Sequence, residues 1–282
     1  INMQPSNLQT FKLGLIGYPL GHSLSPKIHT AALKACGLQA DYSLFTIHPD
    51  DKQGLKELLA HVRSCEITGL NVTIPHKQNV IELMDELTPT AKAVGAVNTI
   101  YLRDEKLIGD NTDAPGFLSD LKKFMGHREL EMEKSALVLG AGGSARAVVY
   151  ALLNDDWNVT ISARRIEQAQ ELSKQFEGLN VAELNFQTFQ LLNSQLIVNT
   201  TPLGMTPNVN QSPWPEKLPF PNAVIYDLVY NPHETKLVKD ARAQGLSATT
   251  GLGMLIEQAA LAFEKWTGHN PPRDVLYTSV VE

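Results

Sequence analysis

The chain has 282 residues, which is long enough for one large or two ordinary domains with sizeable hydrophobic cores. Its hydrophobic content of 43%, charged content of 19% and formal net charge of −6 are typical of a globular protein. This charge gives no reason to expect nucleic acid or an anionic membrane as a partner.

Targeting and redox signals are weak. No segment has the uninterrupted apolar length, about 20 residues, that a membrane-spanning helix needs. The first ten residues lack the basic and apolar regions of a secretory signal peptide. Cys36 and Cys65 belong to no C-x-x-C pair, so we expect neither a disulfide framework nor a zinc site. The sequence therefore favours a cytoplasmic protein with reduced thiols.

Strand and helix patterns alternate in the first part of the chain. Ser25-Pro26 is typical of a helix start, since serine is a preferred N-cap and proline suits the first turn. The expected strands cover 12–16, 42–47, 67–74, 97–101 and 106–108, the last two as a hairpin. One expected helix begins at Ser25, and two more cover 50–62 and 79–87. A short helix is expected from Thr88, and another from near Asp113 to Met125.

The segment 135–146, SALVLGAGGSAR, has the order strand, glycine turn, helix. Gly140 permits a tight turn, Gly142 would let a pyrophosphate approach the backbone, and the small Ala145 allows the helix to pack closely on the strand. The N-terminus of the helix would offer free N–H groups to phosphates. The segment predicts the start of a dinucleotide-binding domain, with a plain turn as the alternative on local grounds.

The alternation continues to the C-terminus. Further strands are expected at 158–162, 195–199, 223–228 and 247–249, and further helices at 166–176, 234–244 and 254–266. Such alternation favours parallel sheets with helices on both faces. Because there are too many units for one compact sheet, we expect two α/β domains with a cleft between them.

The end of the second strand of the dinucleotide-binding unit carries the cofactor preference. An acidic residue there binds a free ribose 2′-hydroxyl, whereas arginine accommodates a 2′-phosphate. This chain has Ala163-Arg164-Arg165 and no acidic residue before Glu167. The planar donor fork of arginine suits phosphate. The sequence therefore favours NADP over NAD, with ordinary surface charge as the alternative.

Lys77 and its neighbours are candidates for chemistry. Lys77 lies at an expected helix start, where a cation opposes the helix dipole. The dipole and partial burial would favour the neutral amine, which suits proton transfer, although a solvated lysine is the simpler alternative. Asn71 and Thr73 alternate on the preceding strand and so face the same side.

Other polar residues have both local and functional interpretations. Ser23 and Ser25 would suit a bound carboxylate, although Ser25 could simply be a helix cap, and the same holds for Asp113. The segment 199–205 follows a strand of the second domain, where ligands of α/β sheets collect. His22, His29, His48 and His76 lack metal-ligand spacing.

Eight ordered segments closely resemble the shikimate dehydrogenase family: HSLSP, GLNVTIPHK, GAVNTI, GDNTD, GAGGSAR, NTTPLGM, DLVYNP and GLGMLIEQAA. The resemblance runs from about Lys12 to the final helices. It implies an α/β fold of two domains: an N-terminal substrate-binding and catalytic domain, 1–112 plus 251–282, and a Rossmann-type NADP-binding domain, 113–250. The C-terminal helices would return to the first domain.

The resemblance also implies roles for individual residues. Ser23 and Ser25 would bind the substrate carboxylate, and Lys77 and Asp113 resemble the catalytic pair. The ring hydroxyls would be bound by Asn71, Thr73, Asn98, Asp113 and Gln258, with Tyr230 adding a contact. The cofactor would be bound by Gly140, Ala141, Gly142, Gly143, Ser144, Ala145, Ala163, Arg164, Arg165, Thr200, Thr201, Pro202, Met205, Leu228 and Gly251.

Two departures from the family pattern concern the cofactor. The family commonly has Asn-Arg-Thr where this chain has Ala163-Arg164-Arg165, and Gln168 stands where a second arginine is often found. These departures affect how strictly the resemblance implies NADP rather than NAD.

The activity that the resemblance implies is the reversible, NADPH-dependent reduction of 3-dehydroshikimate to shikimate, in aromatic amino-acid biosynthesis, without a metal. The alternatives are a quinate or dual quinate/shikimate dehydrogenase using NAD or NADP, and a non-catalytic cofactor-sensing paralogue. The intact Ser23 and Ser25 favour shikimate over quinate, and the presence of Lys77 and Asp113 argues against the paralogue. We expect a monomer or homodimer whose partner is a small-molecule substrate.

Overall fold

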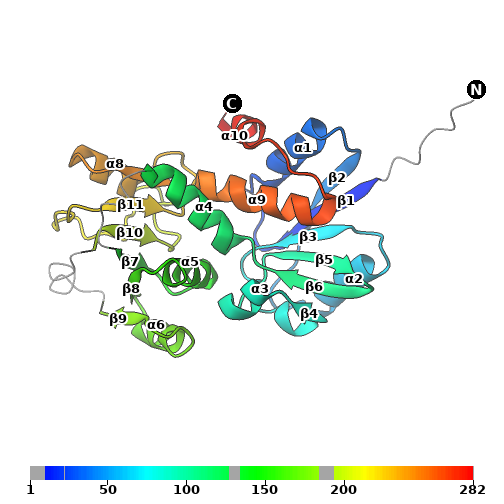
Figure 1. The fold of residues 1–282 in the computed structure, drawn as a ribbon, viewed down its shortest axis with the longest axis horizontal. Coiled ribbons are helices and arrows are strands. Elements are labelled where there is room, and N and C mark those ends of the chain that lie inside the picture. Colours follow the sequence, from blue (N-terminus) through cyan, green and yellow to red (C-terminus); the bar gives the residue numbers. More distant parts are fainter. Residues whose placement is uncertain (1–9, 22, 127–133, 184–193, 282) are drawn as a thin grey trace, which may run out of the picture. The chain divides into compact units, whose positions relative to one another are not determined.

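The computed structural model describes residues 10–21, 23–126, 134–183 and 194–281 (Figure 1). His22, one of the histidines considered above, lies outside the described residues. The chain divides into two compact units, one formed by Ile1–Thr112 with Ile256–Glu282 and the other by Asp113–Leu255. Within the described residues, each unit has its own sheet of six strands.

The first unit contains a mixed sheet with the strand order β2-β1-β3-β5-β6-β4. Its strands are β1 (Phe11–Gly17), β2 (Ala40–Thr46), β3 (Gly69–Val72), β4 (Glu86–Leu87), β5 (Thr99–Arg103) and β6 (Lys106–Asp110). β1 pairs in parallel with β2 and β3, whereas β5 is antiparallel to both β3 and β6. The alternation predicts parallel sheets, and the β5–β6 hairpin makes this sheet mixed because it reverses the chain direction.

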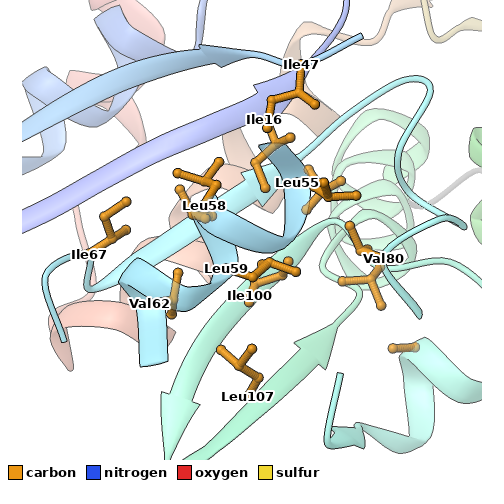
Figure 2. Close-up of a cluster of buried hydrophobic side chains, with 14 residues drawn as sticks. Ile16, Ile47, Leu55, Leu58, Leu59, Val62, Ile67, Val80, Ile100 and Leu107 are labelled. Carbon is orange, nitrogen blue, oxygen red and sulfur yellow. The ribbon is translucent and has the colours of Figure 1, made fainter. Parts of the chain in front are cut away.

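Helices of the first unit cover the sheet with regular apolar faces. They are α1 (Ser25–Ala35), α2 (Lys52–Arg63), the 3-10 helix η1 (Ile81–Leu83), α3 (Pro89–Val94), α10 (Arg273–Val281) and most of α9 (Leu252–Thr267). The Asp51 side chain caps α2 by accepting from the backbone N–H of Gly54 at 2.8 Å. Leu55, Leu59 and other apolar residues on one face of α2 form a buried cluster with strand residues such as Ile100 (Figure 2). Burial of this face holds α2 on the sheet.

The segment 79–87 differs from the predicted helix. Turns follow Pro75, then η1 and the short strand β4. The backbone groups are used elsewhere: the Lys77 carbonyl accepts from the N–H of Val97 at 2.8 Å, and the N–H of Asp85 donates to the carbonyl of Leu107 at 3.0 Å. Tertiary pairing therefore overrides the helical pattern. The predicted helix start at Lys77 is wrong, and so is the dipole argument attached to it.

The second unit has an entirely parallel sheet with the order β12-β11-β10-β7-β8-β9 (Figure 1). Its strands are β7 (Ser135–Leu139), β8 (Asn158–Ser162), β9 (Asn180–Ala182), β10 (Leu196–Asn199), β11 (Val224–Asp227) and β12 (Ala248–Thr250). Its helices include α4 (Asp113–Met125), α5 (Gly143–Leu153), α6 (Ile166–Ser173) and α8 (Lys236–Ala243). This strand order is that of a doubly wound dinucleotide-binding fold, with the switch point between β7 and β10. The predicted α/β fold class with a Rossmann-type second domain is confirmed.

The C-terminal helices belong mainly to the first unit. The boundary between the two units falls between Leu255 and Ile256, inside the continuous helix α9. The boundary expected from the sequence, between residues 250 and 251, lies just before this helix. The last helix, α10, then packs against α1 (Figure 1). Most of α9 and all of α10 thus complete a unit whose sheet is formed by the first 112 residues.

Some features are absent from the part of the chain that the structure describes. No helix there is both long and apolar enough to cross a membrane. Nor is any group of three or more His, Cys, Asp or Glu side chains placed to hold a metal ion. Cys36 is half-buried and Cys65 exposed, and both are free thiols.

Candidate active site

The predicted substrate-binding residues of the first unit gather at one edge of its sheet. Leu15 pairs with Asn71, Asn71 with Thr99, and Thr99 with Asp110, so the ends of β1, β3 and β6 meet the start of β5. Ser23 and Ser25 follow β1, Asn71, Thr73 and Lys77 lie at or after the end of β3, and Asn98 immediately precedes β5. Ligands of α/β proteins bind at such an edge.

The two serines are adjacent at the start of α1. The Ser23 hydroxyl accepts a hydrogen bond from the backbone N–H of Ser25 at 3.2 Å. Leu24 occupies the N-cap position and Ser25 is the first helical residue, so the predicted capping role of Ser25 is wrong. The buried hydroxyl of Ser25 is therefore not used to cap the helix.

Buried amides connect three of the predicted residues. The Asn71 Oδ1 accepts from the Tyr42 hydroxyl at 2.8 Å, and its Nδ2 donates to the Asn98 carbonyl at 3.3 Å. The Asn98 Nδ2 donates to Oε1 of Gln258, on α9, at 3.4 Å. Because Asn71 and Asn98 are buried and bonded through both the oxygen and the nitrogen of their amides, each has one favoured orientation. The structure thus brings Asn71, Asn98 and Gln258 into one network.

Asn98 also joins two strands. Its Oδ1 accepts from the backbone N–H of Thr112 at 2.8 Å, the Thr112 hydroxyl at 3.2 Å and the Thr99 hydroxyl at 3.0 Å. The side chain is 2% exposed. These bonds tie Thr112, two residues after the end of β6, to the start of β5, so Asn98 has a structural role in addition to its predicted contact with the substrate.

Lys77 lies in a turn whose backbone is anchored on both sides. Its carbonyl accepts from Val97, as described above, and the buried His76 donates from Nε2 to the carbonyl of Ile47 at 2.8 Å. The backbone N–H of Thr73 donates to the Ile16 carbonyl at 2.8 Å. Lys77 is half-buried. These bonds fix the position of Lys77 without a helix.

The remaining substrate-binding candidates belong to the second unit. Asp113 is the first residue of α4 and is 6% exposed. Tyr230 follows β11, and burial raises the pKa of its hydroxyl. Since Lys77 belongs to the first unit, its predicted pairing with Asp113 stays a prediction, as does the substrate contact of Tyr230.

The glycine turn and the segment after β10 contact each other in the second unit. Gly140 has φ +106°, and a Cβ there would lie 2.6 Å from Oγ1 of Thr200 and 2.9 Å from Cγ2 of Thr201. The hydroxyl and the backbone N–H of Thr200 both donate to the Leu139 carbonyl, at 2.7 and 2.9 Å. Only glycine fits position 140 without strain.

The N-terminus of α5 is open. Gly142 is its N-cap residue, and no side chain caps it. A Cβ on Gly142 would meet no atom within 4 Å. Backbone N–H groups with free space before them form a suitable site for a phosphate. The predicted binding of a cofactor phosphate at this turn stays a prediction.

Two exposed arginines follow the neighbouring strand β8. The backbone N–H of Gly140 donates to the carbonyl of Ser162 at 2.8 Å, which holds this strand end next to the glycine turn. In the described ranges, neither Arg164 nor Arg165 has a side-chain hydrogen bond or ion pair. Both guanidinium groups can therefore bind an external anion, as a 2′-phosphate would require.

Asp227 is an organising residue that the sequence analysis missed. It is fully buried; its Oδ1 accepts from Asn199 Nδ2 at 2.8 Å, and its Oδ2 accepts from the Thr235 hydroxyl at 2.7 Å. Burial raises the pKa of Asp227 to about 6, and these hydrogen bonds oppose part of the rise. The Oδ1 of Asn199 in turn accepts from the N–H and hydroxyl of Thr201. The sequence signal that could have identified Asp227 is an acidic residue at the end of an apolar strand.

Leu228 and Gly251 are also brought together. A Cβ on Gly251 would lie 2.3 Å from the Leu228 carbonyl oxygen. The two residues follow β11 and β12, the last strands at this side of the sheet. The predicted cofactor residues thus follow β7, β8, β10, β11 and β12 at the carboxyl edge of one parallel sheet.

Comparison with known proteins identifies the family. Successive family models match residues 15–100 (shikimate dehydrogenase substrate binding domain), 124–214 (shikimate / quinate 5-dehydrogenase) and 251–280 (shikimate 5′-dehydrogenase C-terminal domain). The shikimate dehydrogenase (NADP(+)) of Carboxydothermus hydrogenoformans is 42% identical over 280 residues, which cover 97% of this chain and 98% of that relative.

Two solved structures share the fold over nearly their whole length. The shikimate 5-dehydrogenase of Thermus thermophilus, in complex with NADP(H) and shikimate, is 35% identical with a TM-score of 0.83, covering 95% of this chain and 98% of its own. A quinate dehydrogenase from Corynebacterium glutamicum, in complex with NAD, is 30% identical with a TM-score of 0.86, covering 96% of this chain and 99% of its own.

Proposed function

Because this chain belongs to the shikimate dehydrogenase family, we propose that it catalyses the reversible NADP-dependent reduction of 3-dehydroshikimate to shikimate. The observation that carries the proposal is 42% identity to a shikimate dehydrogenase (NADP(+)) over 97% of the chain. We place the enzyme in the cytoplasm, in aromatic amino-acid biosynthesis, with the first unit binding substrate and the second binding NADP.

The substrate carries a carboxylate and several ring hydroxyls, and the edge of the first sheet offers matching groups. Ser23 and Ser25 would donate hydrogen bonds to the carboxylate. Asn71, Thr73, Asn98 and Gln258 would bind the ring hydroxyls, with Asp113 and Tyr230 contributing from the second unit. Buried amides held in one orientation suit this task, because their donors and acceptors need not reorganise on binding.

Lys77 would stabilise the oxygen that changes between ketone and alcohol. During reduction, negative charge develops on that oxygen, and an ammonium group both offsets the charge and donates the proton that completes the hydroxyl. Asp113 would orient Lys77 and bind a neighbouring hydroxyl. NADPH, when bound, supplies the hydride. The anchored turn around Lys77 fixes the donor relative to the sheet edge.

The open N-terminus of α5 would bind the pyrophosphate of the cofactor, and Gly142 leaves the space for it. Arg164 and Arg165 would bind the 2′-phosphate that distinguishes NADP from NAD. Asp227 contributes indirectly, because its bonds to Asn199 fix the segment that contacts the glycine turn.

Lys77→Ala tests the catalytic assignment. We expect kcat for shikimate oxidation to fall by a factor of about 10² to 10⁴, the usual contribution of a general acid or base, with a much smaller change in KM. Initial rates of shikimate-dependent NADP reduction give both constants. Lys56→Ala, which removes an exposed lysine from α2, is the matched control and should leave kcat unchanged. An unchanged kcat in Lys77→Ala would contradict the assignment.

The same assay separates the alternatives. Rates with shikimate and quinate, each with NADP and NAD, should be highest for shikimate with NADP. A preference for quinate or NAD would favour the alternative enzyme, to which the quinate dehydrogenase from Corynebacterium glutamicum is the structural parallel. Binding of NADPH without turnover of either acid would favour the non-catalytic paralogue.

A further inference from the structure

We propose that Tyr42 is a positioning residue for the substrate site: its hydroxyl fixes the orientation of the Asn71 amide. The inference rests on the proposed function, which assigns Asn71 to a ring hydroxyl of the substrate.

The position of Tyr42 in the sheet makes this contact unusual. Tyr42 lies on the edge strand β2, and Asn71 lies on β3, with β1 between them. Tyr42 pairs with Leu13, and Leu13 pairs with Gly69, so Asn71 is two residues further along β3. The Tyr42 side chain therefore extends diagonally across β1. Its hydroxyl then donates to Oδ1 of Asn71 at 2.8 Å.

The hydroxyl determines which way the amide faces. The phenol donates to Oδ1 of Asn71, while Nδ2 donates to the Asn98 carbonyl. A flipped amide would place its oxygen against that carbonyl, with no proton between the two acceptors. Without the Tyr42 hydroxyl, half of this restraint is lost. The Asn71 side chain is 5% exposed, so water does not readily replace the lost donor.

Burial raises the pKa of the Tyr42 hydroxyl. The phenol therefore keeps its proton and acts as the donor in its hydrogen bond to Oδ1 of Asn71.

The ring of Tyr42 is held independently of its hydroxyl. The His29 imidazole stacks on it with ring centroids 4.5 Å apart and an interplanar angle of 7°. His29 is fully buried and also lies beside Trp266, at 5.3 Å between centroids. The Trp266 indole donates to the Ile100 carbonyl at 3.1 Å. Tyr42→Phe therefore keeps the stacked ring and removes only the hydroxyl.

Tyr42→Phe should raise KM for shikimate about tenfold, since loss of one partner leaves a buried polar group unpaired. We expect KM for NADP to stay within about twofold, because the substitution lies in the first unit. Tyr101→Phe is the matched control: Tyr101 is a buried tyrosine of the same sheet, and its hydroxyl makes no hydrogen bond within the described residues. This control should leave both KM values unchanged. A general weakening of the fold would not raise KM for one substrate alone.

A double-mutant cycle tests whether the effect acts through Asn71. Asn71→Ala alone should raise KM for shikimate. The KM of the double mutant should then exceed that of Asn71→Ala by less than about twofold. A tenfold additional increase would overturn the positioning role, and so would an unchanged KM in Tyr42→Phe alone. If the unsubstituted protein does not oxidise shikimate, the proposed function fails instead. The two failures are thus distinguishable.

Discussion

The two sheet edges offer different groups to a ligand. At the edge of the first sheet, side chains bond to one another: Asn71, Asn98 and Gln258 form a buried network. At the edge of the second, the backbone and empty space dominate, because Gly140 and Gly142 carry no side chain and α5 has no cap. A polyhydroxylated ring needs oriented donors and acceptors, whereas a phosphate needs backbone N–H groups and room.

Burial shifts the pKa values of two groups behind the edges in opposite directions. In the first unit, burial lowers the pKa of His29 to about 3, and the neighbouring Asn71 side chain opposes part of the shift. In the second unit, burial raises the pKa of Asp227 to about 6. In both cases burial disfavours the charged form.

The largest expected effect concerns the backbone of the second edge. Gly140→Ala should lower the free energy of unfolding by about 3 kcal/mol, through unfavourable φ and overpacking against Thr200. KM for NADP should rise as the turn shifts. Thermal or denaturant unfolding and initial rates measure the two effects.

Gly142→Ala is the matched control for this prediction. Its φ is −87°, and a Cβ would meet no atom within 4 Å, so stability should be unchanged. The methyl group would instead occupy space assigned to the pyrophosphate, and KM for NADP should rise. A loss of stability in both variants, or an unchanged KM in Gly142→Ala, would contradict the distinction between turn geometry and phosphate space.

The next effect is the pH dependence of stability in the first unit. The unfolded chain binds a proton at His29 near pH 6.5, whereas the folded chain binds it only near pH 3. Below pH 6.5 the unfolded state holds more protons, so this contribution to stability falls as pH falls, by about 1.4 kcal/mol per pH unit. From pH 6.5 to about pH 5 the loss is about 2 kcal/mol.

His29→Phe isolates that contribution, because phenylalanine can keep the stack on Tyr42 and does not titrate. Denaturant unfolding of both proteins across this pH range gives the difference in their free energies. The difference should change with pH below 6.5 and stay constant above it; a constant difference throughout would refute the assignment. Asp227 has the opposite sign, since its raised pKa makes its contribution fall as pH rises from about 3.8 to about 6.

The second edge was more predictable from local sequence patterns than the first. Gly140 and Gly142 are visible because a backbone requirement excludes other residues, and the motif is general. The parallel sheet followed from the alternation of elements. The substrate residues, by contrast, had ordinary local alternatives, and only the family resemblance gave them specific roles, since a lone asparagine or threonine on a strand has no specific pattern.

The errors have one physical cause, which is that local patterns do not contain tertiary partners. The segment 79–87 has helical spacing, but its backbone and the turn before it pair with Leu107 and Val97 instead. Ser25 is a good N-cap by type, yet Leu24 occupies that position. Tyr42, His29 and Asp227 matter because of residues that lie far away in the sequence, so no local pattern specified their roles.

The smallest expected effect tests the one part of the second edge that uses side chains. Replacing both Arg164 and Arg165 by alanine should raise KM for NADP about tenfold, because charge-assisted hydrogen bonds to the 2′-phosphate are lost. KM for NAD should change little, since NAD has no such phosphate. Arg103→Ala, which removes an exposed arginine from the first unit, is the control. Equal losses for both cofactors would mean that the arginines support the turn rather than read the phosphate, and no loss at all would make them ordinary surface charge. If KM for NADP does rise, the single substitutions show how much each arginine contributes. A large effect of Arg165→Ala would mean that Arg165 replaces the second arginine that the family often has at the position of Gln168.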